Sequence, residues 1–285
     1  MRLLAALLLA ASAWAAPPPR FFVAGDGQLA LVNTHTGARV AARYRRADGS
    51  YDAGTVERIR RVFGGEASLR LIEVLSHLQR LAGGRPLTLV SGYRSPEYNE
   101  QLREQGAKAA AGSLHTEGLA ADVAFPRPLL RGLWRKVRAL DCCGAGYYAR
   151  QGFLHVDVGQ PRFWEAATSR VDENLSAGNA RLFARTEFDR FTRGEAITVT
   201  LHALTAPPVK IARVARFGGD EDARVTLEGS ELREVDGCLE AARSGASVRV
   251  AGAPAARRGR LLLVICEPRP ERTPATVETN PVEIR

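Results

Sequence analysis

The pattern of apolar and polar positions divides the chain into two stretches of different periodicity. Up to Trp164, apolar residues recur at helical spacing in some segments and alternate in others, which is typical of mixed helices and strands. Beyond Trp164, short alternating runs follow one another between clusters of Pro, Gly and Asp, without helical periodicity. This change predicts an α+β domain followed by an all-β domain.

The first stretch predicts a small, mostly antiparallel sheet with helices packed on one side of it. Alternating residues on either side of Thr34–Gly37 predict a hairpin whose turn lies at those residues. A glycine pair after residue 82 predicts a helix end, and Ser95 followed by Pro96 predicts a helix start. The expected helices cover residues 52–63, 67–82, 96–105 and 128–140, and the further expected strands cover residues 86–91, 119–125, 144–150 and 153–159.

Five alternating runs in the second stretch predict the strands of an all-β, sandwich-like domain. They are AITVTLHAL, VKIARVARF, ARVTLEG, SVRVAG and RLLLVICE. The small and polar residues 166–180 before them predict a linker, so the expected β domain covers residues 181–285. The closing TPATVETNPVEIR is expected to form an edge strand or to stay mobile.

The first residues predict an export signal. One arginine, an apolar run and Ala13-Trp14-Ala15 before three prolines are typical of a secretory signal peptide over residues 1–15. The run is shorter than the about 20 apolar residues that a membrane-spanning helix needs. We therefore expect an exported protein without stable membrane insertion, whose first folded domain covers residues 16–165.

The charge of the chain narrows the classes of partner. Lysines and arginines number 40 against 31 acidic residues, which gives a net charge of +9. A basic exported protein suits phosphorylated envelope polymers or acidic peptides. Nucleic acid is not expected as a partner, because the scattered arginines form neither an aromatic-interleaved stripe nor a finger or helix-turn-helix pattern.

The four cysteines are compatible with disulfides in an exported protein. Cys238 and Cys266 flank a strand-like region and are expected to form one bridge. For the adjacent Cys142 and Cys143, a bridge would close a strained ring, so free buried thiols are at least an equal alternative.

Two of the five histidines have a spacing that suits a metal site. His115 lies in the turn before an expected strand, Asp122 lies within that strand, and the small residues between them allow a close approach. His155 lies in another expected strand. Two histidines and one carboxylate are the ligand set of a catalytic zinc, which keeps a fourth position for water. The sequence thus predicts a hydrolase with one Zn²⁺ per chain, held by these three residues.

Asp157 is the expected general base, because residues two apart on a strand share a face and Asp157 therefore lies beside His155. The alternative is that Asp157 orients the imidazole of His155. Glu117, two residues after His115, is a second candidate base, although we expect its side chain to face solvent.

Other polar residues near these motifs have alternative roles. Arg94, between a strand and a helix, can bind a substrate carboxylate or hold its loop by a salt bridge. Ser113 can hydrogen bond to the substrate or cap the turn that carries the first histidine. His35 and His77 have no carboxylate or histidine at ligand spacing, and His202 lies in an expected strand of the β domain, so all three are expected to be structural.

Five motifs occur in order along the first stretch: NTHTG, SGYRSPEYN, SLHTEGLAAD, GAGYY and FLHVDVG. The third motif, followed by a strand histidine, resembles the D-Ala-D-Ala metallopeptidase family, whose fold is shared with lysostaphin-type peptidases and the hedgehog signalling domain. The five motifs together resemble the murein endopeptidase K branch of that family. The resemblance covers residues 29–164.

This resemblance implies an exported, periplasmic bacterial enzyme that cuts peptide cross-links of peptidoglycan, with the peptide stems as substrate. It also implies the three zinc ligands already expected from their spacing. The wider family carries a histidine two residues, or a glutamate three residues, before its last ligand as the base. This chain has Phe153 and Gly152 at those positions, which favours Asp157 as the base instead.

Two other functions stay open on the sequence. One is a D,D- or L,D-carboxypeptidase that trims stem peptides. The other, motivated by the missing upstream base, is a non-catalytic, zinc-bearing module that binds the envelope. The resemblance does not cover the expected β domain, for which glycan and a protein partner are both compatible.

Overall fold

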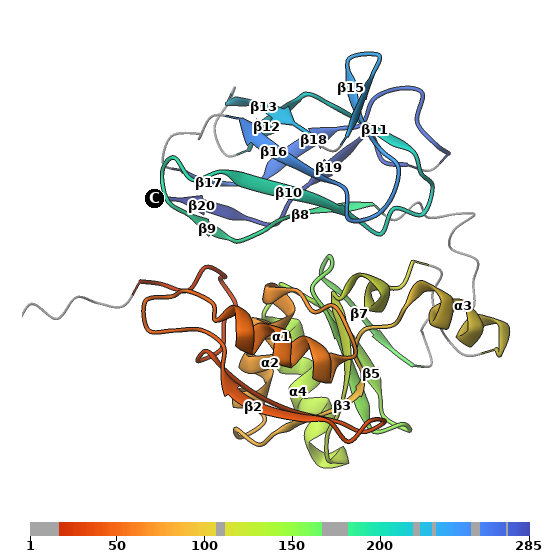
Figure 1. Cartoon of the computed structure of the whole chain (residues 1–285). Helices are drawn as coiled ribbons and strands as arrows, with labels where there is room; N and C mark the ends of the chain where they lie inside the picture. Colours follow the sequence, from red (N-terminus) through yellow and green to blue (C-terminus); the bar gives the residue numbers. More distant parts are fainter. Residues whose placement is uncertain are drawn as a thin grey trace, which may run out of the picture.

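The computed structural model describes residues 17–106, 112–166, 182–218, 223–229, 232–251, 257–271 and 273–285. The expected signal peptide, and the expected linker apart from its first residue, lie outside these ranges. A mixed sheet with helices forms the first part of the chain and a β domain forms the second, below and above in Figure 1. None of the described helices has the length and apolar character needed to cross a membrane.

A seven-stranded sheet forms the first part, in the order β2-β1-β3-β4-β6-β5-β7. Two neighbouring pairs, β1 with β3 and β5 with β7, are parallel, and the four others are antiparallel. The sheet is therefore mostly antiparallel, as expected. Its strands are β1 (Gln28–Asn33), β2 (Arg39–Arg43), β3 (Leu87–Ser91), β4 (Ala120–Ala124), β5 (Gly144–Tyr148), β6 (Phe153–Asp157) and β7 (Arg162–Glu165).

The four expected α-helices are confirmed. The side chains of Asp52, Ser68 and Ser95 accept backbone N–H bonds at the starts of the first three, which explains where these helices begin. Helices α1, α2 and α4 pack on the sheet and share one apolar core with it, whereas α3 stands at its rim (Figure 1). The helices are α1 (Ala53–Phe63), α2 (Leu69–Leu81), α3 (Pro96–Glu104) and α4 (Arg127–Ala139).

Alternation along β4 and β6 separates the core from the candidate site. Apolar residues at every second position of these strands are buried in the core that the helices share. Because neighbouring side chains on a strand point to opposite faces, Asp122 in β4 and His155 and Asp157 in β6 lie on the other face. The sheet thus builds the core with one face and presents the candidate site on the other.

The second part is a largely antiparallel β domain, as expected, and has no helix among its described residues. Its main sheet has the order β19-β18-β12-β13-β16-β10-β8, and the edge strands β19 and β8 also contact each other, so the sheet nearly closes into a barrel. Two three-stranded sheets, β11-β15-β14 and β17-β20-β9, complete it. The strands are β8 (Phe183–Thr186), β9 (Arg190–Phe191), β10 (Ile197–His202), β11 (Val209–Ala212), β12 (Val214–Phe217), β13 (Arg224–Glu228), β14 (Arg233–Val235), β15 (Cys238–Ala241), β16 (Ser247–Ala251), β17 (Arg257–Gly259), β18 (Leu261–Val264), β19 (Thr276–Glu278) and β20 (Val282–Ile284).

Several strand assignments differ from the expectation, since β8, β9, β14, β15 and β17 lie outside the five expected runs. The run VKIARVARF forms two strands in different sheets, β11 and β12, because the chain changes sheets at Arg213. Strand β7 was not expected, since its four residues are too few to show a clear alternation. The C-terminal segment forms the expected edge strand, β19, and adds β20 to a smaller sheet.

Both cysteine pairs are bridged. The expected disulfide between Cys238 and Cys266 is present. Cys142 and Cys143 also form a disulfide, so they are not the free thiols that the sequence left as an equal alternative.

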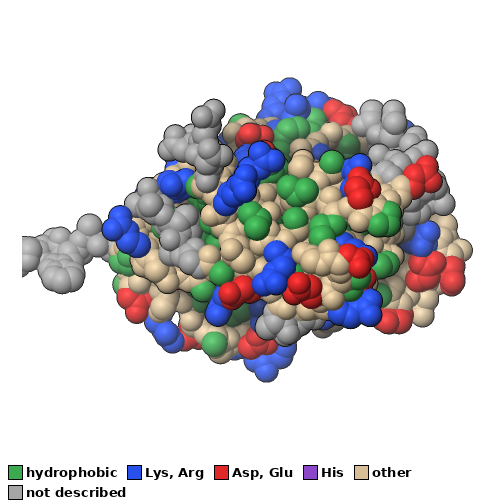
Figure 2. All heavy atoms as spheres, turned by 90° about the horizontal axis from the view of Figure 1, so that it is seen from above, with side chains coloured by type: hydrophobic (Ala, Val, Ile, Leu, Met, Phe, Trp, Pro, Cys, Tyr) green, Lys and Arg blue, Asp and Glu red, His purple; other side chains and the backbone are tan. Residues whose placement is uncertain are grey.

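Charged side chains of both signs are interspersed on the face of the molecule shown in Figure 2. Some of the positive charge of the β domain is balanced within that domain, as in the ion pairs Arg213–Glu234 and Lys210–Asp236. This distribution agrees with the expectation that the arginines are scattered over the surface.

Candidate metal centre

Three side chains meet on the face of the sheet opposite the helices. Asp122 and His155 are direct partners in the pairing of β4 with β6, and His155 Nδ1 lies 2.9 Å from Asp122 Oδ1. His115 comes from the 3₁₀ helix η1 (Leu114–Glu117), and its Nε2 lies 3.3 Å from His155 Nδ1 and 3.5 Å from Asp122 Oδ1. One ligand atom from each residue therefore lies within 4.8 Å of the others, a spacing that allows one metal ion to bind all three.

Each imidazole is oriented by a partner on its far side. His115 Nδ1 lies 2.7 Å from the carbonyl oxygen of Gly92, and His155 Nε2 lies 3.0 Å from Asp157 Oδ2. An N–H directed at such an acceptor leaves the lone pair of the other ring nitrogen free to bind a metal. Both lone pairs then point to the same centre.

Arg94 orients the third candidate ligand in the same way. Its Nη2 donates to Asp122 Oδ2 at 2.9 Å, and its Nε donates to Ser91 Oγ at 2.9 Å. A bulge in β3 between Leu89 and Ser91 brings Ser91 opposite Asp122. This geometry supports the salt-bridge role for Arg94 and leaves Asp122 Oδ1 facing the two histidines.

The charges at the centre depend on one another. Burial alone would lower the pKa of His155, but hydrogen bonds to Asp122 and Asp157 outweigh it and raise this pKa to about 9. Burial lowers the pKa of His115, so its ring is neutral at neutral pH. Burial opposes ionisation of both carboxylates, but the two histidines hold the pKa of Asp122 below its usual range. The positive charge of Arg162 and the hydrogen bond from His155 lower the pKa of Asp157 to about 2.

Asp157 is completely buried, and both of its oxygens have partners. Oδ2 faces His155 Nε2 and Arg162 Nη2, the latter at 2.9 Å. Oδ1 accepts from the backbone N–H of Gly159 at 2.8 Å and from Arg162 Nη1 at 3.2 Å. A carboxylate with such partners and a pKa of about 2 is a weak proton acceptor. The geometry thus supports the orienting role for Asp157 over the role of general base.

Two glycines of β5 make room for these side chains. Gly144 is the cross-strand partner of Asp157, and a Cβ atom on it would lie 2.2 Å from Asp157 Oδ2. Gly146 is the partner of His155, and a Cβ there would lie 2.6 Å from the ring of Trp164. Trp164 packs against His155, with 5.2 Å between the ring centroids. The GAGYY motif is therefore explained by close packing around the candidate ligand in β6.

A cleft of about 370 Å³ opens beside the centre. Asp122 and Arg94 line it at the centre, and Tyr93, Tyr98 and Phe153 add aromatic walls. A concave site with aromatic walls and a few oriented polar groups is typical of a substrate-binding site.

The remaining candidates from the sequence have other partners. Glu117 faces neither solvent nor the centre, since its Oε2 lies 2.8 Å from Nδ1 of His202 in the β domain. His202 thus contacts a carboxylate from a distant part of the chain, which is compatible with the structural role expected for it. Ser113 is buried and precedes η1, but its side chain makes no capping hydrogen bond, so its contact with substrate stays a prediction.

Sequence reasoning missed Arg162 and Trp164, which both lie in β7. The signal for them was weak, because Trp164 reaches His155 only through the parallel pairing of β7 with β5. Their position soon after FLHVDVG was the available hint.

We expect Gly144→Ala to lower both stability and metal affinity, because the added Cβ would displace Asp157. Overpacking of this kind costs about 1–3 kcal/mol in unfolding free energy. Gly132→Ala in α4 is the matched control, since nothing lies within 4 Å of a Cβ there and alanine favours a helix. Denaturant unfolding and competition with a chromophoric chelator measure the two effects; equal behaviour of both variants would contradict this account.

Comparison with known proteins agrees with this geometry. Residues 23–164 match the family model described as peptidoglycan L,D-endopeptidase MepK. The peptidoglycan L,D-endopeptidase MepK of Escherichia coli is 32% identical over 144 residues, which cover 48% of this chain and 79% of the relative. The probable peptidoglycan L,D-endopeptidase MepK of Haemophilus influenzae is 33% identical over 79 residues, which cover 28% of this chain and 42% of the relative. No solved structure matches the chain. The matched region contains the whole His-Asp-His cluster and its orienting partners, and the chain belongs to the MepK family of peptidoglycan L,D-endopeptidases.

Proposed function

We propose that this protein is a zinc-dependent peptidoglycan hydrolase that cleaves peptide cross-links. The observation that carries the proposal is the convergence of His115 Nε2, Asp122 Oδ1 and His155 Nδ1, each aimed by a partner on its far side. Two imidazole nitrogens and one carboxylate oxygen fit a catalytic zinc, which takes three protein ligands and leaves one position open.

The side chains around the centre have separate tasks in this proposal. Zinc, when bound, supplies Lewis-acid polarisation of the peptide carbonyl and activates the hydrolytic water. His115, Asp122 and His155 hold the ion, while Arg94 and Asp157 keep two of these ligands in position. The cleft beside Asp122 holds the peptide stem.

One observation favours an endopeptidase over a carboxypeptidase. A carboxypeptidase needs a cation for the terminal carboxylate of its substrate, and Arg94 was the candidate for that task. The guanidinium of Arg94 is instead bound to Asp122 and Ser91. This supports cleavage of an internal bond, as the name of the Escherichia coli relative also specifies.

The setting that we propose is the periplasm. The disulfide between Cys238 and Cys266 fits an oxidising compartment, and peptidoglycan as substrate requires export. We accordingly propose residues 1–15 as a signal peptide, 16–165 as the peptidase domain, 166–180 as a linker and 181–285 as the β domain.

Digestion of purified, cross-linked sacculi tests the proposed function. With zinc, the mature protein is expected to convert cross-linked dimers into monomers, as read by mass, and a chelator or His115→Ala is expected to reduce this to background. Monomeric pentapeptide stems, offered beside the dimer, are expected to stay intact. Trimming of these stems would favour a carboxypeptidase, and intact sacculi with zinc bound would favour a non-catalytic binding module.

Asp157→Asn separates orientation from base catalysis. An orienting Asp157 predicts a loss of zinc affinity of about 10- to 100-fold, with turnover largely regained at saturating zinc. A general base at Asp157 instead predicts unchanged zinc affinity and a loss of kcat that zinc does not restore. Chelator competition and kcat at saturating zinc, measured on the same preparation, decide between them.

Zinc binding at pH 7 is expected to release about one proton. His155 has a pKa of about 9 in the metal-free protein and therefore carries a proton that has to leave, whereas His115 is already neutral. Zinc affinity should consequently rise with pH and level off near the pKa of His155. Titration calorimetry in buffers of different ionisation enthalpy counts the protons, and a count near zero would contradict a protonated His155.

A further inference from the structure

We propose that the β domain positions the metal centre, with His202 and Arg185 as the two positioning residues. The inference rests on the proposed zinc site and assigns a role to a domain that lies outside the region matched by the relatives, which ends at residue 164. Contacts from one face of the β domain hold both segments that carry the histidine ligands.

Alternation in β8 and β10 selects the residues that face the peptidase domain. Phe183 and His202 are partners in the pairing of these strands, and Arg185 lies two residues along β8 from Phe183. These three side chains therefore share a face. Phe183 is packed into the core of the peptidase domain, which identifies that face as the one in contact with it, whereas Ala184 and Leu201 are buried in the core of the β domain.

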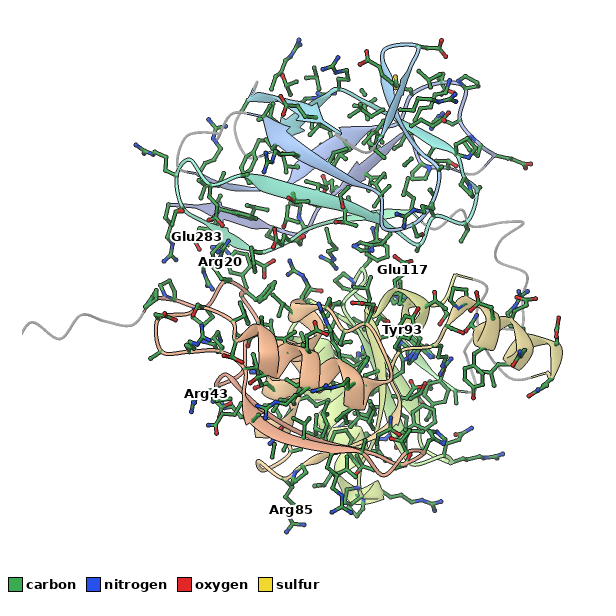
Figure 3. All side chains as sticks on the ribbon, viewed as in Figure 1. Arg20, Arg43, Arg85, Tyr93, Glu117 and Glu283 are labelled. Carbon is green, nitrogen blue, oxygen red and sulfur yellow. A yellow bond between two sulfur atoms is a disulfide. The ribbon has the colours of Figure 1, made fainter. Side chains whose placement is uncertain are left out.

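The first contact holds the short helix that carries His115. Glu117, the last residue of η1, accepts a hydrogen bond from the backbone N–H of Ala203 at 2.9 Å, and its other carboxylate oxygen lies 2.8 Å from His202 Nδ1. Figure 3 shows Glu117 at the side of the peptidase domain that faces the β domain. Because a 3₁₀ helix of four residues has little stability of its own, this two-point contact adds to the bonds from Gly92 and Arg94 that hold η1 and its histidine within the peptidase domain.

The second contact reaches His155 through a chain of hydrogen bonds. The guanidinium of Arg185 donates to the carbonyl oxygens of Val158, at 3.1 Å, and of Gly159. The N–H of Gly159 donates to Asp157 Oδ1, and Asp157 Oδ2 faces His155 Nε2. Burial lowers the pKa of Arg185 to about 10, which leaves the guanidinium charged at neutral pH. A charged donor to two carbonyls directly after Asp157 fixes the end of β6.

The two segments also meet each other where the β domain holds them. A Cβ atom on Gly159 would lie 2.7 Å from the side chain of Leu114, the residue before His115. The segment before η1 is in contact as well, since a Cβ on Gly112 would lie 2.9 Å from Thr205 of the β domain. Movement of the β domain would therefore shift the segments of His115 and Asp157 together, and with them the distances between the ligand atoms.

Arg70 provides a contact between the domains that does not touch the site segments. It extends from α2 to the Asp189 carboxylate and to the carbonyl oxygen of Thr186, at 3.0 Å. Loss of this contact weakens the association of the domains without removing a bond to η1 or to the end of β6. Arg70→Ala is thus the matched control for both positioning residues.

The experiment compares zinc affinity, by chelator competition, in the full chain and in the variants His202→Ala, Arg185→Ala and Arg70→Ala. Positioning predicts a loss of about tenfold or more for the first two, the range found for residues that orient ligands, and a change below twofold for Arg70→Ala. His202→Asn, whose amide nitrogen takes the place of Nδ1 and keeps a donor for Glu117, is expected to restore most of the affinity. Glu117→Gln weakens the same contact from the other side and replaces Arg185→Ala if that variant fails to fold.

Two results would overturn the inference. One is zinc affinity within twofold of the unchanged protein in the His202, Glu117 and Arg185 variants. The other is an equal loss in Arg70→Ala, which would show that any weakening of the interface has the same effect. Failure of the proposed function has a different signature, because sacculi would then stay intact although zinc binds and its affinity still depends on His202 and Arg185.

Discussion

The pairing of β4 with β6 is the constraint on which the candidate site depends. This register places Asp122 directly opposite His155, and it also buries the alternate apolar residues of both strands in the core. A slip of either strand by one residue would turn its candidate ligand into the core and its apolar residues outward, at a large cost in burial. The hydrophobic core therefore enforces the distance between the two candidate ligands. The third ligand is placed by less regular structure, η1, which needs other support.

The candidate ligands are oriented by residues that are not themselves candidate ligands. Gly92, Asp157 and Arg94 each bind the far side of one candidate ligand. Gly92 and Arg94 lie in the loop that follows the bulged strand β3, and Asp157 is the last residue of β6. Buried polar groups of this kind stabilise a structure only when all of them are satisfied. The absent side chains of Gly144 and Gly146 belong to the same arrangement, because they leave the space in which Asp157 and Trp164 lie.

The features that depend on residues close together in the sequence could be predicted from local patterns. The helix start at Ser95 follows from its capping side chain, the helices over residues 52–63 and 67–82 from their periodicity, and the shared face of His155 and Asp157 from strand alternation. Contacts between distant segments were not predictable in this way. Glu117 looked like an exposed residue of a turn because His202 is 85 positions away, and Arg162 became visible as a partner of Asp157 only once β7 was placed beside β5. The alternation in VKIARVARF predicted a single strand, but the chain changes sheets at Arg213 and forms two strands there. Alternation carries no information on which sheet a strand joins.

The charges at the centre suit hydrolysis of a peptide bond. Arg94 and Arg162 match the two negative charges of Asp122 and Asp157, so these four groups together with protonated His155 carry a net positive charge in the metal-free protein. A divalent cation bound in place of that proton would increase this net positive charge beside the cleft. In the proposed hydrolysis, a peptide carbonyl attacked in this cleft would gain negative charge on its oxygen, and fixed positive charge would stabilise that state more than the neutral substrate. The two arginines thus do more than hold ligands, because without them the carboxylates would cancel the field that favours the reaction.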